Sequence, residues 1–124
     1  MPRRTKLPAE IRADDYVAVV KTGKRLPPTK TMPTQGEYRG VDGTGKTGTI
    51  RISPGLTRLD ELKTLLHEVL HFTFDMGDIQ LNAGITMRQE EIIVAGMEGW
   101  LTTILLQNPE LRALLDEASD WLGG

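Results

Sequence analysis

The fold of this chain is decided by residues 57–74, which read TRLDELKTLLHEVLHFTF. Thr57 can cap the start of a helix, and Asp60 suits the positive end of its dipole. We expect the helix to run to about Phe74, before Gly77. Its apolar residues recur at helical spacing in one broad stripe, namely Leu59, Leu62, Leu65, Leu66, Val69 and Leu70. The pattern predicts an amphipathic helix that packs this stripe against a core.

Two further helices are predicted after it. Thr86 and Gln89 form a capping-box pattern that opens a helix through about Gln107. Asn108-Pro109 then supplies a cap and a first-turn proline for a last helix that ends at Gly123.

The preceding half of the chain predicts strands and turns. Residues 16–20 form an apolar run typical of a buried strand, and residues 49–53 alternate as a half-buried strand does. Residues 37–41 are the expected hairpin partner of 49–53, joined to it by a glycine-rich turn. We therefore predict one α+β domain over residues 1–124. A small, strongly twisted antiparallel sheet from residues 1–56 would pack on about three helices from residues 57–124.

Composition narrows the range of functions. The 124 residues are 39% apolar and 26% charged, with a formal net charge of −2. Such a balance gives no electrostatic reason to expect nucleic acid or an anionic membrane as a partner. No apolar run has the length of a signal peptide or a membrane span, so we expect a cytoplasmic protein. Because cysteine is absent, a metal would have to be bound by histidine and carboxylate.

The first helix carries an H-E-x-x-H motif, His67-Glu68-Val69-Leu70-His71. Residues four apart lie on one helical face, so both imidazoles can bind a single zinc ion. Glu68 is rotated by about 100° from His67 on a 3.6-residue helix. Its carboxylate is therefore placed to act on a water rather than to bind the metal.

The alternative is that the two histidines are structural. However, they are the only histidines in the chain. They also lie away from the leucine stripe, on the face shared with Asp60 and Thr64. Core histidines would lie within the stripe, so the pattern favours ligands beside a polar cleft.

A catalytic zinc usually has three protein ligands, so a carboxylate is expected as the third. The second helix offers Glu90, Glu91 and Glu98. On a helical wheel Glu90 projects from the middle of the apolar stripe, and the other two lie at its margin. A buried carboxylate needs a partner or a metal, so Glu90 is the predicted ligand, with Glu91 or Glu98 as alternatives. Glu90 could also be an exposed first-turn acid favoured by the helix dipole.

Around these residues the sequence resembles the small phage- and prophage-encoded metallopeptidase-like proteins. These are minimal gluzincins near the SprT-like and ImmA/IrrE-type domains. The resemblance covers about residues 36–115 and rests on the H-E-x-x-H motif and the downstream glutamate. It implies a zincin-like domain in which His67, His71 and a second-helix glutamate hold zinc and Glu68 is catalytic. No clear counterpart of the oxyanion-stabilising Tyr or His of larger gluzincins is visible, which leaves Tyr38 as an open candidate.

The expected function is hydrolysis of a peptide or protein substrate, with water activated by zinc and Glu68. One alternative is a zinc-binding module of a phage or mobile element that regulates or binds without catalysis. The other is a nucleotide-binding protein, because residues 40–47 satisfy the P-loop pattern G-x-x-x-x-G-K-[ST]. That pattern needs a buried strand before it and a helix after it. Here a strand is predicted to follow, so a hairpin turn explains the glycines better.

Other residues have structural explanations. Trp100 and Trp121 fall on predicted apolar faces and are expected in the core or in helix packing. Met76, Met87 and Met97 are expected to fill gaps. Asp75 and Asp78 follow the motif and could orient a ligand histidine or cap the next turn.

Overall fold

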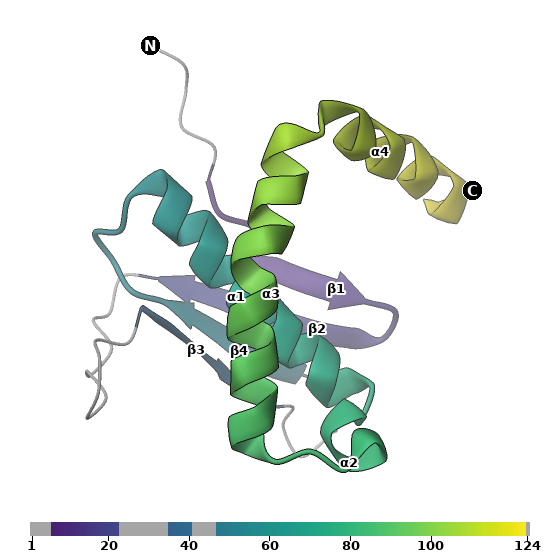
Figure 1. The fold of residues 1–124 in the computed structure, drawn as a ribbon. Helices are drawn as coiled ribbons and strands as arrows, with labels where there is room; N and C mark the ends of the chain where they lie inside the picture. Colours follow the sequence, from purple (N-terminus) through teal and green to yellow (C-terminus); the bar gives the residue numbers. More distant parts are fainter. Residues whose placement is uncertain (1–5, 23–34, 41–46, 124) are drawn as a thin grey trace.

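The computed structural model describes residues 6–22, 35–40 and 47–123, with side chains as far as Asp120. A four-stranded sheet forms one layer, helix α1 (Arg58–Met76) crosses one of its faces, and helix α3 (Met87–Gln107) lies over α1 (Figure 1). The described strands come from the N-terminal half of the chain and the helices from the C-terminal half. The predicted α+β class is therefore confirmed.

The sheet contains four strands in the order β1-β2-β4-β3. They are β1 (Glu10–Ala13), β2 (Tyr16–Thr22), β3 (Gly36–Arg39) and β4 (Thr47–Ile52). Strand β1 was not predicted. It pairs with β2 across a tight turn in which Asp14 has a φ of 52°, a left-handed conformation that aspartate tolerates better than most residues.

The prediction of an antiparallel sheet was wrong, because the sheet is mixed. The hairpin of β3 and β4 forms as expected, with Tyr38 opposite Ile50. However, β4 also pairs in parallel with β2, with Val17 opposite Thr47. The physical reason is burial. Gly48, Ile50 and Ile52 alternate as buried residues along β4, so this strand takes a central place, while the polar strand β3 occupies the edge.

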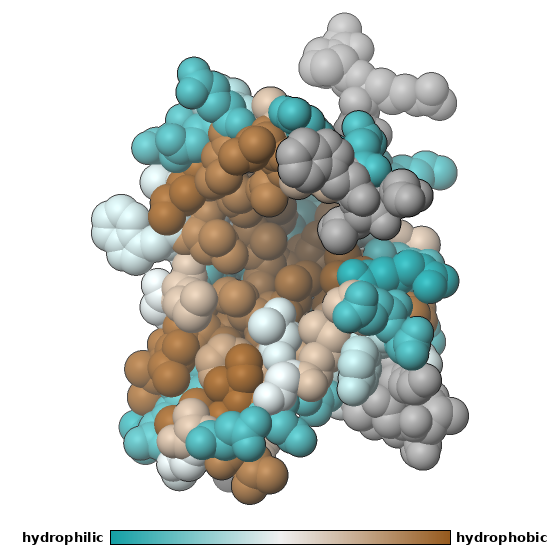
Figure 2. All heavy atoms as spheres, turned by 90° about the vertical axis from the view of Figure 1, so that its right-hand side faces the viewer, coloured by the Kyte–Doolittle hydropathy of each residue, from teal (hydrophilic) through white to brown (hydrophobic). Residues whose placement is uncertain are grey.

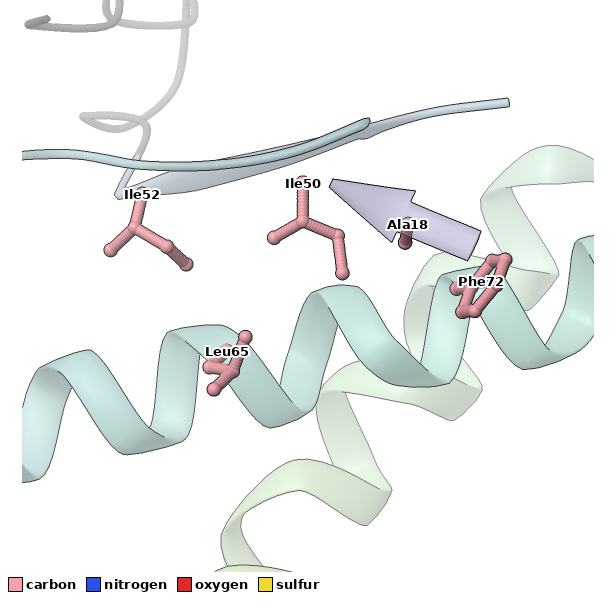
Figure 3. Packing of buried hydrophobic residues seen from close by; sticks show 5 residues of the cluster. All are labelled: Ala18, Ile50, Ile52, Leu65 and Phe72. Atoms are coloured by element: carbon pink, nitrogen blue, oxygen red, sulfur yellow. The ribbon is translucent and has the colours of Figure 1, made fainter. Parts of the chain in front are cut away.

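The core lies between the sheet and α1 (Figure 3). Ala18 of β2 and Ile50 and Ile52 of β4 point towards Leu65 and Phe72 of α1. The strand residues of this cluster are completely buried, and Phe72 is nearly so. Fully burying one such large apolar side chain contributes about 2 kcal/mol. These contacts fix the position of α1 on the sheet, and with it the position of the motif.

The predicted start signals of the two long helices are confirmed. Thr57 precedes α1, and its side chain accepts a hydrogen bond from the backbone N–H of Asp60 at 3.2 Å. Thr86 and Gln89 form the complete capping box at the start of α3. Helix α1 ends at Met76, two residues later than expected, with Gly77 as its C-cap.

Two more helices, one short and one long, complete the helical half. Helix α2 (Ile79–Ala83) is a single turn that was not predicted, and it leads into the capping box of α3. Helix α4 (Pro109–Gly123) begins at the predicted proline. The Asn108 side chain donates to the Ile104 carbonyl at 2.7 Å, so it satisfies an acceptor in the last turn of α3.

The predicted burial of several apolar residues on α3 was wrong. Trp100 is 74% exposed, and Met87 and Met97 are 79% and 45% exposed. Trp100 and Met97 lie on the side of α3 that is turned away from α1, where the described chain supplies nothing to cover them, whereas Met87 is the first residue of the helix. The side chain of Trp121 lies outside the described residues. Among the described helices, none is long and apolar enough to cross a membrane.

The structure also bears on the P-loop pattern. Residues 41–46 lie outside the described residues, but Thr47 begins strand β4. A phosphate-binding loop of this type leads into a helix whose N-terminus receives the phosphates. The strand at this position therefore argues against the nucleotide-binding alternative.

Candidate metal centre

The two histidines of the motif lie side by side where α1 faces α3. Their ring centroids are 5.0 Å apart, and the rings meet edge to face at 64°. The side chains are 18% and 14% exposed for His67 and His71. The expected helical placement of the pair is therefore observed, with both rings largely covered and directed at the glutamates of α3.

The carboxylate of Glu91 contacts both histidine rings. Its Oε1 lies 2.9 Å from Nε2 of His67, and its Oε2 lies 2.7 Å from Nε2 of His71. One ligand atom from each of the three side chains can be chosen so that all lie within 4.8 Å of one another. Two ligand atoms bound to one tetrahedral zinc are roughly 3.3 Å apart, given bond lengths of about 2 Å. The donor set of two imidazoles and one carboxylate could therefore hold a metal ion, and these are ligand types that zinc accepts.

Glu90, the predicted third ligand, lies on the other side of His71. Its Oε2 is 2.7 Å from Nδ1 of that ring, and Gln80 donates to its Oε1 at 3.3 Å. Ligand histidines commonly have a carboxylate on the nitrogen that does not bind the metal, where it fixes the tautomer and the ring orientation. The geometry therefore places Glu90 as a neighbour that orients His71, and it favours Glu91 as the third ligand.

Glu98 has a similar relation to His67, although a looser one. Its Oε2 is 3.8 Å from Nδ1 of His67, beyond ordinary hydrogen-bond length. The three glutamates of α3 thus face different nitrogens of the two rings. Glu91 faces both Nε2 atoms, while Glu90 and Glu98 each face one Nδ1 atom.

The burial of α3 explains why the helical wheel favoured Glu90. The wheel counted every apolar residue of the helix as buried, including Trp100 and Met97, which are exposed. The residues that are in fact fully buried are Val94 and Thr102. If the direction of Glu90 around the helix axis is taken as 0°, Val94 points to about 40° and Thr102 to about 120° on a helix of 3.6 residues per turn. The centre of the buried face is therefore near Glu91 and Glu98.

Glu68 is buried beside strand β3, with only 4% of its surface exposed. A Cβ atom added to Gly36 would lie 3.0 Å from its Oε2 and 2.5 Å from Cγ2 of Thr64. The glycine therefore permits the close approach of strand and helix at this point. Thr64 is buried here as well, so the face predicted to be polar is covered by β3 on this side.

The surroundings of Glu68 change its acidity. Burial raises its pKa from 4.5 to about 7, since water no longer stabilises the charged form. Nearby His71 opposes the shift, while Glu91, Glu37 and Glu98 add to it. A carboxylate whose pKa lies near neutral pH can both accept and release a proton there, which is the property required of a general base.

Tyr38, the open candidate for oxyanion stabilisation, forms a separate contact. Its hydroxyl donates to Oδ2 of Asp75 at 2.6 Å, and its ring lies 5.8 Å from that of Phe72. Burial and the hydrogen bond to Asp75 raise the pKa of Tyr38, with a smaller contribution from Glu90. Asp75 was a candidate to orient a ligand histidine, and the structure places it against Tyr38. Asp78 precedes α2 at the cap position, but its side chain forms no capping hydrogen bond.

Comparison of the chain with protein-family models, with curated proteins and with solved structures finds no match. The resemblance to the small gluzincins therefore stays a prediction based on the motif residues.

Proposed function

We propose that this chain is a zinc-dependent metallopeptidase that hydrolyses a peptide or protein substrate in the cytoplasm. The supporting observation is that the carboxylate of Glu91 faces Nε2 of both motif histidines, at 2.9 Å and 2.7 Å. Two imidazoles and one carboxylate leave the fourth position of a tetrahedral zinc for water, as hydrolytic sites require. The side chain of Glu91 is 56% exposed, so this side of the site is open to a substrate.

In this proposal the residues of the chain divide the work. A bound zinc would lower the pKa of a water towards ~7 and polarise the scissile carbonyl. Glu68 would accept a proton from the attacking water as the oxygen of the water adds to the carbonyl carbon. The same carboxyl group then gives the proton to the leaving nitrogen as the C–N bond breaks. Glu90 holds the ring of His71 in orientation through its Nδ1 atom.

One observation favours the alternative, a zinc-binding module without catalysis. Glu68 is 4% exposed and packs beneath Gly36, so strand β3 covers part of the carboxyl group that the reaction needs. If no substrate-accessible water can reach Glu68, the same ligands would hold a structural or regulatory ion. The two functions share the metal site and differ only in turnover.

The two functions are separated by measuring zinc content and proteolysis on the same preparations. The variants are Glu68→Gln and, as a matched control, Glu117→Gln, which makes the same change at an exposed position of α4. We expect one equivalent of zinc in all three proteins. Cleavage of fluorescein-labelled casein is expected in the wild type and in Glu117→Gln and absent in Glu68→Gln. Zinc binding without cleavage by the wild type would support the non-catalytic module. Both functions require that zinc binding is lost when His67 or His71 is replaced by Ala.

A further inference from the structure

The outer side of α3 is apolar and carries no charge. Between Ile92 and Gln107 the only charged residue is Glu98, which faces His67 on the inner side. A helix that is apolar on every side is normally buried on every side. Four large side chains nevertheless lie exposed along one line of α3, by 39% to 74%, and these are Ile93, Met97, Trp100 and Ile104. Their spacing of four, three and four residues is that of the contact seam between two packed helices.

Helix α4 also carries exposed apolar side chains, and it is exposed over a larger part of its surface. Every described side chain from Pro109 to Asp120 is exposed. Leu111, Leu114 and Leu115 share one side of the helix and are 37%, 60% and 54% exposed. A helix of 15 residues is only marginally stable in water without packing. Helix α4 therefore needs a partner that covers its leucines.

The exposed residues of the two helices lie on consecutive elements, since α4 begins at Pro109, directly after Asn108 at the end of α3. Helix α4 turns away from the sheet at the end of α3 (Figure 1). Seen from that side, hydrophobic side chains gather over a broad, partly hollowed area with hydrophilic residues around it (Figure 2). We call the seven exposed residues just named on α3 and α4 the α3/α4 face. From their exposed fractions, they present on the order of 700 Å² per chain, close to the ~800 Å² that each partner buries in a stable protein interface.

We propose that the α3/α4 face is a dimer interface, and that its occupant is the α3/α4 face of a second copy of this chain. In a two-fold dimer the same surface serves both subunits, so it must be complementary to itself. An apolar surface without charges meets this condition, since pairing it with itself brings no like charges together. The area is also larger than the apolar patches of 300–600 Å² that are usual on monomers.

The charges around the face argue against a membrane as the occupant. The described part of α4 carries four acidic residues, Glu110, Asp116, Glu117 and Asp120, against one basic residue, Arg112. Helices that lie on membranes usually carry lysine and arginine on their polar side, which anionic lipids attract. Acidic residues would instead be repelled by such lipids. Binding to lipid is therefore an outcome of the test that would contradict the proposal.

The test is the mass of the protein in solution as a function of concentration, by sedimentation equilibrium. The variants are Trp100→Glu and Leu114→Glu, which place a charge on the face. The control is Ala113→Glu, which adds the same charge to an exposed position on the side of α4 opposite the three leucines. We expect a dimer for the wild type and for Ala113→Glu. For the two variants we expect a dissociation constant raised by about 30-fold or more, the effect of losing a central interface residue.

Hydrogen exchange of the wild type gives a second readout that does not depend on the folding of any variant. Amide protection in residues 92–106 and 111–118 should rise with protein concentration, while protection in the sheet should not. A wild type that stays monomeric at high micromolar concentration would overturn the proposal, as would a dimer that persists in both glutamate variants. Wild-type monomers that bind neutral phosphatidylcholine vesicles would assign the face to lipid instead. Because these measurements do not depend on zinc or turnover, they test the interface separately from the proposed function.

Discussion

Glu91 of α3 lies opposite His71 of α1, with its Oε2 2.7 Å from Nε2, while the preceding residue, Glu90, contacts Nδ1 of the same ring at the same distance. Two adjacent residues of one helix thus contact the two nitrogens of one imidazole. A histidine uses one nitrogen to bind a metal, and the other is free for a carboxylate that orients the ring. The arrangement assigns a different role to each glutamate.

The first prediction separates these two roles. In Glu91→Ala the site loses a ligand, and we expect zinc content after dialysis to fall from one equivalent to near zero. In Glu90→Ala the three ligands remain, and zinc affinity should fall by about 10- to 100-fold, the usual effect of losing a partner of a ligand histidine. Competition with a fluorescent chelator measures both affinities. A larger loss in Glu90→Ala than in Glu91→Ala would show that Glu90 is the ligand after all.

The second prediction concerns the stability of the metal-free protein as a function of pH. The pKa of Glu68 is about 7 in the folded protein, against an ordinary value of 4.5. The folded state therefore binds this proton more tightly than the unfolded state does. The resulting stabilisation is complete below pH 4.5 and is lost as the pH rises to about 7.

The measurement is urea denaturation of chelator-treated wild type and Glu68→Gln at several pH values. The shift of the Glu68 pKa corresponds to a loss of about 3 kcal/mol across this range, an upper value for a single group. The glutamine variant is neutral throughout and should lack this part of the pH dependence. Groups that do not interact with Glu68 are common to both proteins and cancel in the comparison. If the free energy of unfolding depended on pH in the same way in both proteins, the pKa of Glu68 would not be raised in the folded state.

The third prediction tests the close contact between β3 and α1. A Cβ atom at position 36 would lie 2.5 Å from Thr64 and 3.1 Å from the carbonyl oxygen of Arg51, so strand or helix must move. We expect Gly36→Ala to lower the free energy of unfolding by about 1–3 kcal/mol, the usual cost of overpacking. Gly99→Ala is the matched control, because nothing lies within 4 Å of the added atom. There we expect a gain of up to about 1 kcal/mol from helix propensity.

The fourth prediction concerns the hydrogen bond of 2.6 Å between Tyr38 and Asp75. Because the hydroxyl already donates its proton to Asp75, we expect Tyr38→Phe to reduce stability more than catalysis. Chemical denaturation of Tyr38→Phe, Asp75→Ala and the double variant should give a coupling energy of about 1–3 kcal/mol. If peptidase activity is found, kcat of Tyr38→Phe should stay within a few-fold of the wild type. A loss of 100-fold or more in kcat, as expected for an oxyanion donor, would give Tyr38 that role.

Local signals in the sequence determined much of this protein. The cap at Thr57, the capping box at Thr86 and the proline at position 109 all mark helix starts in the structure, because each signal acts within one helical turn. The spacing of His67 and His71 likewise places both rings on one face of α1, since a helix repeats every 3.6 residues. The hairpin of β3 and β4 follows from neighbouring residues in the same way.

Tertiary structure alone decided the rest. Strand β4 lies between β2 and β3 and pairs in parallel with β2, which depends on which strand is most completely buried. The choice of Glu91 over Glu90 opposite the two Nε2 atoms depends on how α3 is rotated where it crosses α1. That rotation could not be obtained from hydrophobicity, because Trp100 and its apolar neighbours on α3 are exposed. A helical wheel reports which residues share a face, whereas only the packed structure shows which face is turned towards the neighbouring helix.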